Sequence, residues 1–399
     1  MQRCILTSLV NILKKIANVI EKKSVSPFST PVTKQISYLE SLKEPHDLIE
    51  RSFMQYKCQM KLKGMLVHSL INLASAPLLL VILLRKESPI TPCRDICDKD
   101  TPRAAYFDDL TTDIIPIEIS SSFDIVPCSS TSQGRLTKKD RAFFRQIVVR
   151  YPFSWHFLLK TLVKVRQYRG VIDSINPKAF IVCSEYSFAS SLMTAYLHEN
   201  GIVHINVMHG EKLFFIRDSF FQFDRCYVWD DKLVDLFIDL RAHRNQFHVS
   251  IPPSLRLCIQ EGRKRYDFTY YLGGETRQQL DAILLHMLKL RKKGFHLCIR
   301  PHPRYTDVSE LAPFINAGIH LETCECVSIE ESLSTTRHAL SLYSTVLRQA
   351  YENGIPIVID DLSDSSKYRQ LQETRFAILA KPHTLLSDYI DNGIAEKQA

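Results

Sequence analysis

Several signatures of familiar protein classes are missing from this chain of 399 residues. It has no arginine-rich run, no aromatic RNA-binding signature and no zinc-finger spacing, so nucleic acid is a poor candidate for its partner. The adjacent acidic pairs Asp108-Asp109, Asp230-Asp231 and Asp360-Asp361 lack the intervening residue of a DxD metal motif. Chemistry without a metal is therefore favoured, and we expect no metal site.

The cysteines form no recognisable framework. There are 11 of them, an odd number, and no two close pairs lie at zinc-ribbon spacing. We therefore expect reduced thiols in a cytosolic protein. Residues 2–13 contain an apolar stretch, but Lys14 and Lys15 follow where a cleavable signal peptide would need small residues.

The composition is that of an ordinary globular protein, with 45% hydrophobic and 24% charged residues. The length suggests two or three domains. The formal net charge of +8 suits anionic partners, namely nucleotide phosphates, lipid phosphates or an acidic membrane surface.

Two apolar segments lie early in the chain. Residues 4–23 place apolar side chains at helical spacing among four lysines, which predicts a basic amphipathic helix docked either on the protein's own core or on an anionic membrane. Residues 65–84 are long enough to span a bilayer, although His68, Asn72 and Pro77 weaken that interpretation. We expect membrane association, spanning or partly inserted, at the inner face of the cytoplasmic membrane.

The rest of the chain predicts an α/β protein. Residues 87–135 look like a linker with a β-like run over Ile114–Ile119, and residues 143–169 predict one helix. From about residue 140, short apolar strands alternate with helices, which is typical of a parallel sheet. The pattern lapses over 241–264, a second predicted linker, and then resumes.

This alternation predicts two Rossmann-like domains facing across a cleft. We expect a helical N-terminal region over residues 1–98, an acceptor-side domain over 99–255 and a nucleotide-binding domain over 256–399.

Three elements of the last domain follow predicted strands, where ligands bind in open α/β sheets. Gly273-Gly274 would let backbone amides approach a ligand closely. Arg300, His302 and Arg304 bracket the end of the next strand, and Ser344-Thr345 begins a helix whose free N–H groups can hold a phosphate. Each element has a plain structural alternative, as a tight turn, a turn histidine or a helix cap. Their convergence on one sheet edge favours a phosphate site.

Two segments carry a resemblance. IRPHPR (299–304) and SLYSTVLRQAYENGIPIVI (341–359) resemble the His-Pro and Ser-Thr motifs of bacterial sialyltransferases and polysialyltransferases, and those of CDP-glycerol glycerophosphotransferases. These are surface-polysaccharide transferases of the GT-B fold. The resemblance covers roughly residues 170–385, and it implies that His302, Ser344 and Thr345 bind the phosphate of the donor nucleotide.

Three residues are candidates for the catalytic base. His209-Gly210 ends a predicted strand and resembles the His-Gly step of the glycerophosphotransferases, in which the histidine is a candidate base. Sialyltransferases place an acidic pair before a glycine, whereas Glu211 follows the glycine here, and Glu185 ends another strand. The structural alternatives are a histidine satisfied by a backbone carbonyl, and a loop or capping carboxylate.

The sequence therefore predicts a membrane-associated glycosyltransferase that uses a nucleotide-activated sugar, with CMP-linked sugars among the donors, and no cofactor. Its acceptor would be a surface, capsular or lipid-linked glycan. A CDP-polyol phosphotransferase, a nucleotide-sugar 2-epimerase and a non-catalytic polysaccharide-assembly protein remain alternatives. An epimerase needs neither an acceptor nor a membrane segment, so residues 65–84 argue against it.

Overall fold

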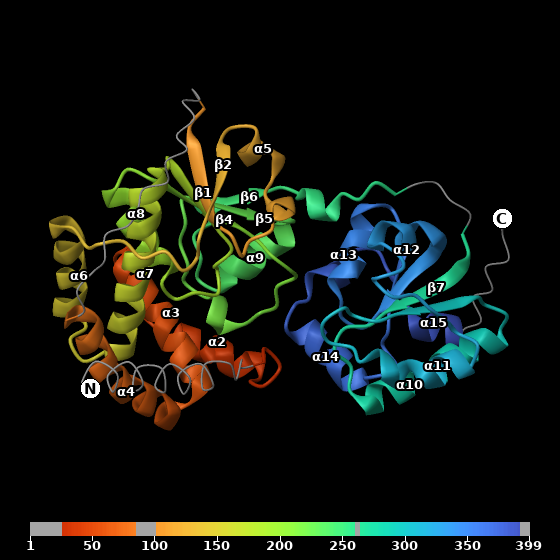
Figure 1. The fold of residues 1–399 in the computed structure, drawn as a ribbon. Helices are drawn as coiled ribbons and strands as arrows, with labels where there is room; N and C mark the ends of the chain where they lie inside the picture. The colour runs from red at the N-terminus through yellow and green to blue at the C-terminus, as the bar shows by residue number, and fades with distance from the viewer. Residues whose placement is uncertain (1–25, 85–100, 260–263, 392–399) are drawn as a thin grey trace, which may run out of the picture. The chain divides into compact units, whose positions relative to one another are not determined.

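The computed structural model describes residues 26–84, 101–259 and 264–391, which belong to two compact units (Figure 1). The first unit comprises the chain up to His209 together with Phe214–Ser250, and the second comprises Gly210–Leu213 and the chain from Ile251 onward. Each unit holds a six-stranded sheet in which every pairing is parallel. The predicted α/β class with two Rossmann-like units is confirmed.

The first sheet has the strand order β2-β1-β3-β4-β5-β6. Its strands are β1 (Arg103–Phe107), β2 (Asp124–Cys128), β3 (Ala179–Val182), β4 (Val203–Val207), β5 (Arg225–Val228) and β6 (Phe247–Val249). All four residues of β3 are buried, as expected for a strand covered on both faces.

Among the described helices of this unit, three precede the first strand in the chain and the others lie between the strands. These helices are α2 (Val32–Glu40), α3 (Leu48–Lys63), α4 (Met65–Leu84), α5 (Ile117–Ser120), α6 (Lys138–Arg150), α7 (Trp155–Ile175), α8 (Ser190–Glu199) and α9 (Asp231–Asp239). The N-terminal region is thus helical in its described part. The amphipathic helix predicted over 4–23 lies outside the described residues.

The helix predicted over 143–169 is in fact two helices. α6 ends at Arg150, and α7 starts at Trp155. Pro152 has no N–H to donate, and a residue before proline is disfavoured in the α-helical region, so Tyr151 leaves the helix with φ −133° and ψ 55°. The single helix was therefore a wrong prediction.

Both predicted linkers contribute strands to the first sheet. β1 and β2 lie inside the stretch 87–135, and Ala104 and Ala105 of β1 are fully buried. The β-like run over Ile114–Ile119 is instead a 3₁₀ turn followed by the short helix α5. The second linker supplies β6, which pairs with β5 at the sheet edge. These strands are short and weakly apolar, so their periodicity is a poor signal.

The second sheet has the strand order β12-β11-β10-β7-β8-β9. Its strands are β7 (Tyr266–Tyr271), β8 (Leu297–Arg300), β9 (His320–Leu321), β10 (Thr336–Ser341), β11 (Ile357–Ile359) and β12 (Thr384–Leu385). Its helices are α10 (Arg277–Lys292), α11 (Ala312–Asn316), α12 (Ile329–Thr335), α13 (Thr345–Glu352), α14 (Ser365–Glu373) and α15 (Leu386–Ile390).

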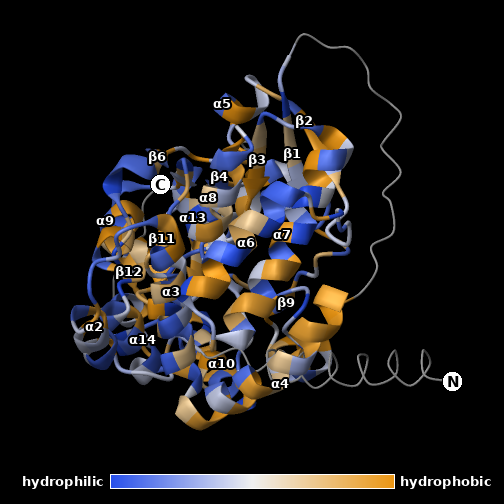
Figure 2. Ribbon diagram, turned by 90° about the vertical axis from the view of Figure 1, so that its left-hand side faces the viewer, coloured by the Kyte–Doolittle hydropathy of each residue, from blue (hydrophilic) through white to orange (hydrophobic). Residues whose placement is uncertain are grey.

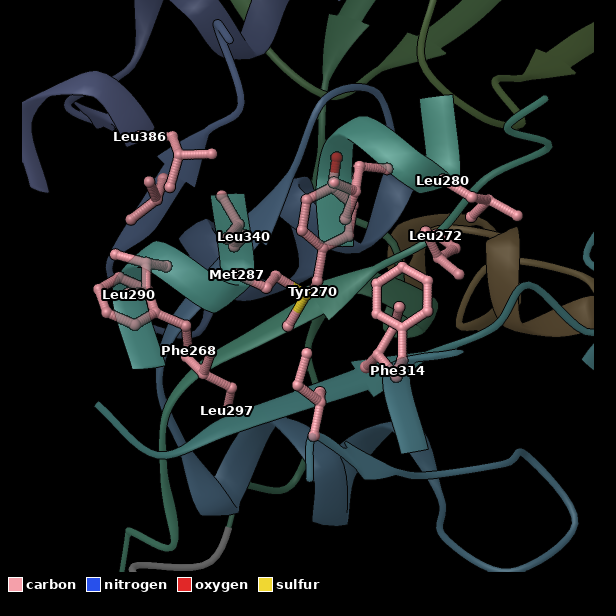
Figure 3. Packing of buried hydrophobic residues seen from close by; sticks show 14 of the residues in the cluster. Phe268, Tyr270, Leu272, Leu280, Met287, Leu290, Leu297, Phe314, Leu340 and Leu386 are labelled. Carbon is pink, nitrogen blue, oxygen red and sulfur yellow. The ribbon is translucent and has the colours of Figure 1, made fainter. Parts of the chain in front are cut away.

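The core of the second unit packs α10, α11 and α15 on one face of this sheet (Figure 3). Phe268 and Tyr270 of β7 lie against Met287 and Leu290 of α10, and Leu340 of β10 lies in the same cluster. Side chains alternate along a strand, so Thr269 and Tyr271 point to the opposite face. This packing fixes β7, β8 and β10 side by side.

We predict that Leu340→Ala destabilises the second unit by about 2–5 kcal/mol, because it leaves a cavity where a fully buried side chain of β10 packs. Leu285→Ala is the matched control, since the Leu285 side chain on α10 is 55% exposed, and its effect should stay within about 0.5 kcal/mol. Urea denaturation measures both. Equal effects of the two substitutions would contradict this description of the core.

Candidate functional site

The three elements predicted to bind phosphate follow three adjacent strands. β7 lies between β10 and β8 in the sheet, and all three run parallel. Their carboxyl ends therefore meet at one edge, and the loops that leave them start side by side. Gly273-Gly274 follows β7, His302 follows β8, and Ser344 follows β10.

The loops after β7 and β8 are joined directly. The Thr306 hydroxyl donates to the Gly273 carbonyl at 3.0 Å and accepts the His302 N–H at 3.1 Å. A Cβ added to Gly274 would lie 3.4 Å from Cβ of Tyr305, an ordinary packing distance. The glycine turn and the histidine turn thus form one surface.

The loop after β10 closes the other side of the glycine turn. A Cβ added to Gly273 would lie only 3.3 Å from the Tyr343 carbonyl oxygen, so glycine permits this close approach. The Ser344 side chain caps α13 by accepting the Val346 N–H at 3.2 Å. Thr345, the first helical residue, is exposed. The first turn of α13 therefore presents backbone N–H groups and hydroxyls at this edge.

His302 is held in a defined tautomer. Its Nδ1 accepts the Arg304 backbone N–H at 3.1 Å, so the neutral ring carries its proton on Nε2. The ring stacks on Tyr305 with centroids 4.4 Å apart. Burial and then the charge of Arg304 lower the pKa of His302. A neutral imidazole with Nε2–H can donate a hydrogen bond to a phosphate oxygen.

Glu275 occupies part of this surface. Both of its carboxylate oxygens accept the Gly273 N–H at 2.8 Å. Burial, and more weakly the charge of Asp360, raise the pKa of Glu275 against the opposing hydrogen bond from Gly273. An anionic ligand that used the Gly273 amide would have to displace this carboxylate.

The two arginines predicted for the site behave differently. The Arg300 side chain is buried, donates to the Val327 carbonyl at 2.7 Å and lies 3.8 Å from the Glu322 carboxylate. These contacts order the loop before α12, which is a structural role. Arg304 is exposed in the histidine turn. Phosphate binding by either arginine stays a prediction.

Lys367 was missed by the sequence reasoning. It lies on α14, which follows β11, the next strand along the sheet from β10, and its Nζ stands 5.8 Å from the ring centroid of Tyr343, the neighbour of Ser344. Burial lowers the pKa of Lys367 to about 8, and Asp364 opposes the shift. The sequence could have indicated Lys367, because α14 follows a predicted strand of the same sheet.

The three candidate bases lie in different surroundings. His209 follows β4 in the first unit and is exposed. Glu185 is buried, with 1% of its surface exposed, and accepts a bond from Asn206 Nδ2 at 3.3 Å. Of these two, only His209 offers its side chain to a dissolved or bound substrate without rearrangement.

Glu211 takes part in a buried ion pair of the second unit. Its carboxylate accepts from Nε of Arg348 at 2.7 Å, and the two side chains are 2% and 0% exposed. Glu352, one turn further along α13, lies 3.3 Å from the same guanidinium. This arrangement favours a structural role for Glu211. The role of each of the three candidates in catalysis stays a prediction.

No group of three or more His, Cys, Asp or Glu side chains in the described part of the chain is arranged to hold a metal ion. Phosphate charge at this edge would be met by N–H donors, by His302 and by Lys367.

Comparison with known proteins gives distant structural matches. No protein-family model matches the chain, and no curated protein matches it either. Among solved structures, UDP-N-acetylglucosamine 2-epimerase from Rickettsia bellii is 11% identical with a TM-score of 0.43, over 72% of this chain and 92% of that one. UDP-GlcNAc 2-epimerase from Methanocaldococcus jannaschii, in complex with UDP-GlcNAc and UDP, is 12% identical with a TM-score of 0.40, over 64% and 83%.

The calicheamicin glycosyltransferase CalG4 is similar at 10% identity with a TM-score of 0.42, over 71% of this chain and 85% of that one. At TM-scores below 0.5, these similarities carry no argument about the activity of this chain.

We predict that Lys367 titrates near pH 8 and that a bound nucleoside diphosphate raises its pKa, because the anion stabilises the ammonium form. The folded pKa lies below the ordinary value of 10.5, so this lysine lowers stability below pH 8, and stability recovers as the pH rises from 8 to 10.5. NMR of ¹³C-dimethylated lysines, assigned with Lys367→Arg, measures the titration. A Lys367 pKa that CMP, UDP, CDP and GDP all leave unchanged would remove this residue from the site.

Proposed function

We propose that the chain is a glycosyltransferase of the GT-B type whose second unit binds a nucleotide-activated sugar. One observation carries the proposal, namely the meeting of Gly273-Gly274, His302 and Ser344 at the carboxyl ends of three adjacent parallel strands. This is the place where α/β sheets bind nucleotides.

The chemistry of the site suits a phosphate leaving group. Transfer of a sugar from a nucleotide leaves negative charge on the phosphate, which donors placed in advance stabilise. His302 Nε2–H, the first turn of α13 and the Lys367 ammonium are such donors. None of these donors requires a metal ion.

We propose His209 as the base that accepts the proton of an acceptor hydroxyl. Its support is its exposure and its position directly after β4, whereas Glu185 is buried and Glu211 is ion-paired. A base of this kind contributes about 10²–10⁴-fold in rate.

The finer assignments are proposals of the same kind. A surface, capsular or lipid-linked glycan is the acceptor we propose, with CMP-linked sugars among the donors to be tested and the inner face of the cytoplasmic membrane as the location. Their support is the motif resemblance of segments 299–304 and 341–359 and the apolarity of α4, which has a mean hydropathy of 2.1.

A nucleotide-sugar 2-epimerase is the second candidate, because a phosphate site at this sheet edge would serve it equally. None of the donor-site residues of the second unit requires an acceptor. Incubation with UDP-GlcNAc alone separates the two. An epimerase forms the 2-epimer without an acceptor, whereas a transferase needs an acceptor for turnover.

The donor site predicts a binding phenotype. In a thermal-shift screen with CMP-, UDP-, GDP- and CDP-linked sugars, one class should raise the melting temperature. His302→Ala and Ser344→Ala should each weaken binding of that donor by roughly 10–100-fold, since each removes a hydrogen bond to a charged group.

Two control variants separate binding from folding. His296→Ala changes an exposed histidine before β8, at the opposite edge of the sheet, and Thr137→Ala removes the cap of α6 in the first unit. Both should bind donor normally. Normal donor affinity in both site variants would overturn the assignment.

The proposed base predicts a kinetic phenotype. His209→Gln should lower turnover by about 10²–10⁴-fold while donor affinity stays nearly unchanged, because a base acts on the acceptor. His248→Gln is the matched control, as it changes another exposed histidine of the first unit. If His209→Gln retains normal turnover while Glu185→Gln or Glu211→Gln abolishes it, the base is a carboxylate.

A further inference from the structure

The surface formed by α4, α6 and the start of α7 has no role in the proposed sugar transfer. α4 is the one helix in the described residues that is long and apolar enough to cross a membrane (Figure 2). Only 11% of its most apolar stretch is buried in the protein. Leu66 is 83% exposed, and Leu70 and Leu80 are also exposed. Soluble monomers rarely expose an apolar surface of this size.

The polar residues of α4 explain how the helix is held. The Asn72 side chain donates to the Phe153 carbonyl at 2.9 Å and accepts the His156 N–H at 3.0 Å, so it caps the N-terminus of α7 from a neighbouring helix. His68 lies 2.9 Å from the Tyr56 hydroxyl of α3. Since both residues point into the first unit, α4 is fixed along the protein surface.

The two faces of α4 are therefore distinct. His68, Asn72, Ser75 and Leu79 follow one another at helical spacing on the face that contacts the protein. The exposed leucines follow the same spacing on the other face. A helix attached by one whole side cannot also be surrounded by lipid, so these contacts favour a helix lying in the plane of a bilayer over a spanning one.

The apolar surface continues beyond α4. Val149 at the end of α6 is 72% exposed, and Phe153 in the turn before α7 is 77% exposed. Phe153 is also the residue whose carbonyl Asn72 binds. The turn that carries Phe153 therefore lies next to α4, and Val149 precedes Phe153 by four residues.

A groove of about 420 Å³ opens beside α4 in the first unit. Its apolar lining includes Ile82 and Leu83 from α4 and Phe144 and Val148 from α6. The groove has the size of an ordinary small-molecule site. The apolar part of the lining includes residues of α4 itself and suits a hydrocarbon chain.

The groove is also lined by basic side chains. Arg141 and Arg145 lie one turn apart on α6 and are exposed, and Arg166 of α7 lines the groove and is buried. Among the described residues that line the groove there is no acidic side chain. Arginine matches the geometry of phosphate, so the lining offers complementary side chains both to an apolar chain and to an anionic headgroup.

We propose that this groove binds the phosphate headgroup of an anionic lipid, with α4 lying in the plane of the bilayer beside it. Arg141 and Arg145 contact the headgroup, and the exposed face of α4, together with Val149 and Phe153, enters the boundary between headgroups and acyl chains. The site belongs wholly to the first unit, so it does not depend on the donor site.

Vesicle flotation of the full chain tests the proposal. The protein should bind vesicles of phosphatidylcholine mixed with phosphatidylglycerol and bind much less to phosphatidylcholine alone. The double variant Arg141→Gln/Arg145→Gln should weaken binding to anionic vesicles by roughly tenfold or more, because each basic residue near the surface attracts anionic lipid. Arg225→Gln/Arg244→Gln changes two exposed arginines elsewhere in the first unit and should bind normally.

The apolar face has its own matched pair. Leu80→Gln/Phe153→Gln should lose vesicle binding, whereas Leu285→Gln/Ile315→Gln, on exposed apolar positions of the second unit, should not. An in-plane helix should be extracted from vesicles by alkaline carbonate. Resistance to carbonate would overturn the in-plane orientation in favour of a spanning helix.

Three other outcomes would overturn the site. Equal binding to neutral and anionic vesicles would exclude headgroup recognition. If inorganic phosphate protects the protein against heat to the same extent as short-chain phosphatidylglycerol, the groove is a site for free phosphate. A stable dimer whose formation Leu80→Gln/Phe153→Gln abolishes, without vesicle binding by the unsubstituted protein, would assign the surface to a second copy of this chain.

Discussion

Parallel pairing of β7 with β10 on one side and with β8 on the other is the constraint on which the donor site depends. Gly273, His302 and Ser344 are separated by 29 to 71 positions in the sequence, and only this pairing makes their loops neighbours. The buried cluster around Phe268, Tyr270 and Leu340 fixes the pairing from one face of the sheet. Packing in the core of the second unit therefore determines where the three loops of the site lie, although none of the core residues would touch a ligand.

Those features of the site that follow from strand order could be predicted from the sequence. β3 is fully apolar and β8 is apolar up to its last residue, so both were predicted as strands, and residues directly after parallel strands lie at one sheet edge. The directions and contacts of the side chains could not be predicted from the sequence. Arg300 ends the same strand that leads to His302, but alternation places it away from the α10 core, against Val327 and Glu322. Glu275 folds back onto Gly273, a contact that no spacing rule encodes.

Weak patterns caused the errors in the fold. β1 reads RAAYF, a run too short and too rich in alanine to signal a strand, yet it lies between β2 and β3 and its two alanines are fully buried. Pro152 marks the break between α6 and α7 in the sequence, but the apolar periodicity on both sides of it predicts a single helix. In the sequence, His68 and Asn72 weaken the interpretation of residues 65–84 as a spanning helix. In the structure they attach α4 to the protein, so the same residues explain both why α4 is polar in places and where it is held.

The ion pair of Glu211 with Arg348 bears on how the chain can be divided. Gly210–Leu213 belongs to the second unit, although it follows β4 of the first. A fragment that begins after residue 250 would contain Arg348 at the centre of α13 but would lack the carboxylate that it binds at 2.7 Å. Removing one member of a buried pair typically costs about 3–5 kcal/mol, a large share of the stability of a small domain. The second unit is thus discontinuous in the sequence, because Gly210–Leu213 belongs to it and carries one partner of its buried ion pair.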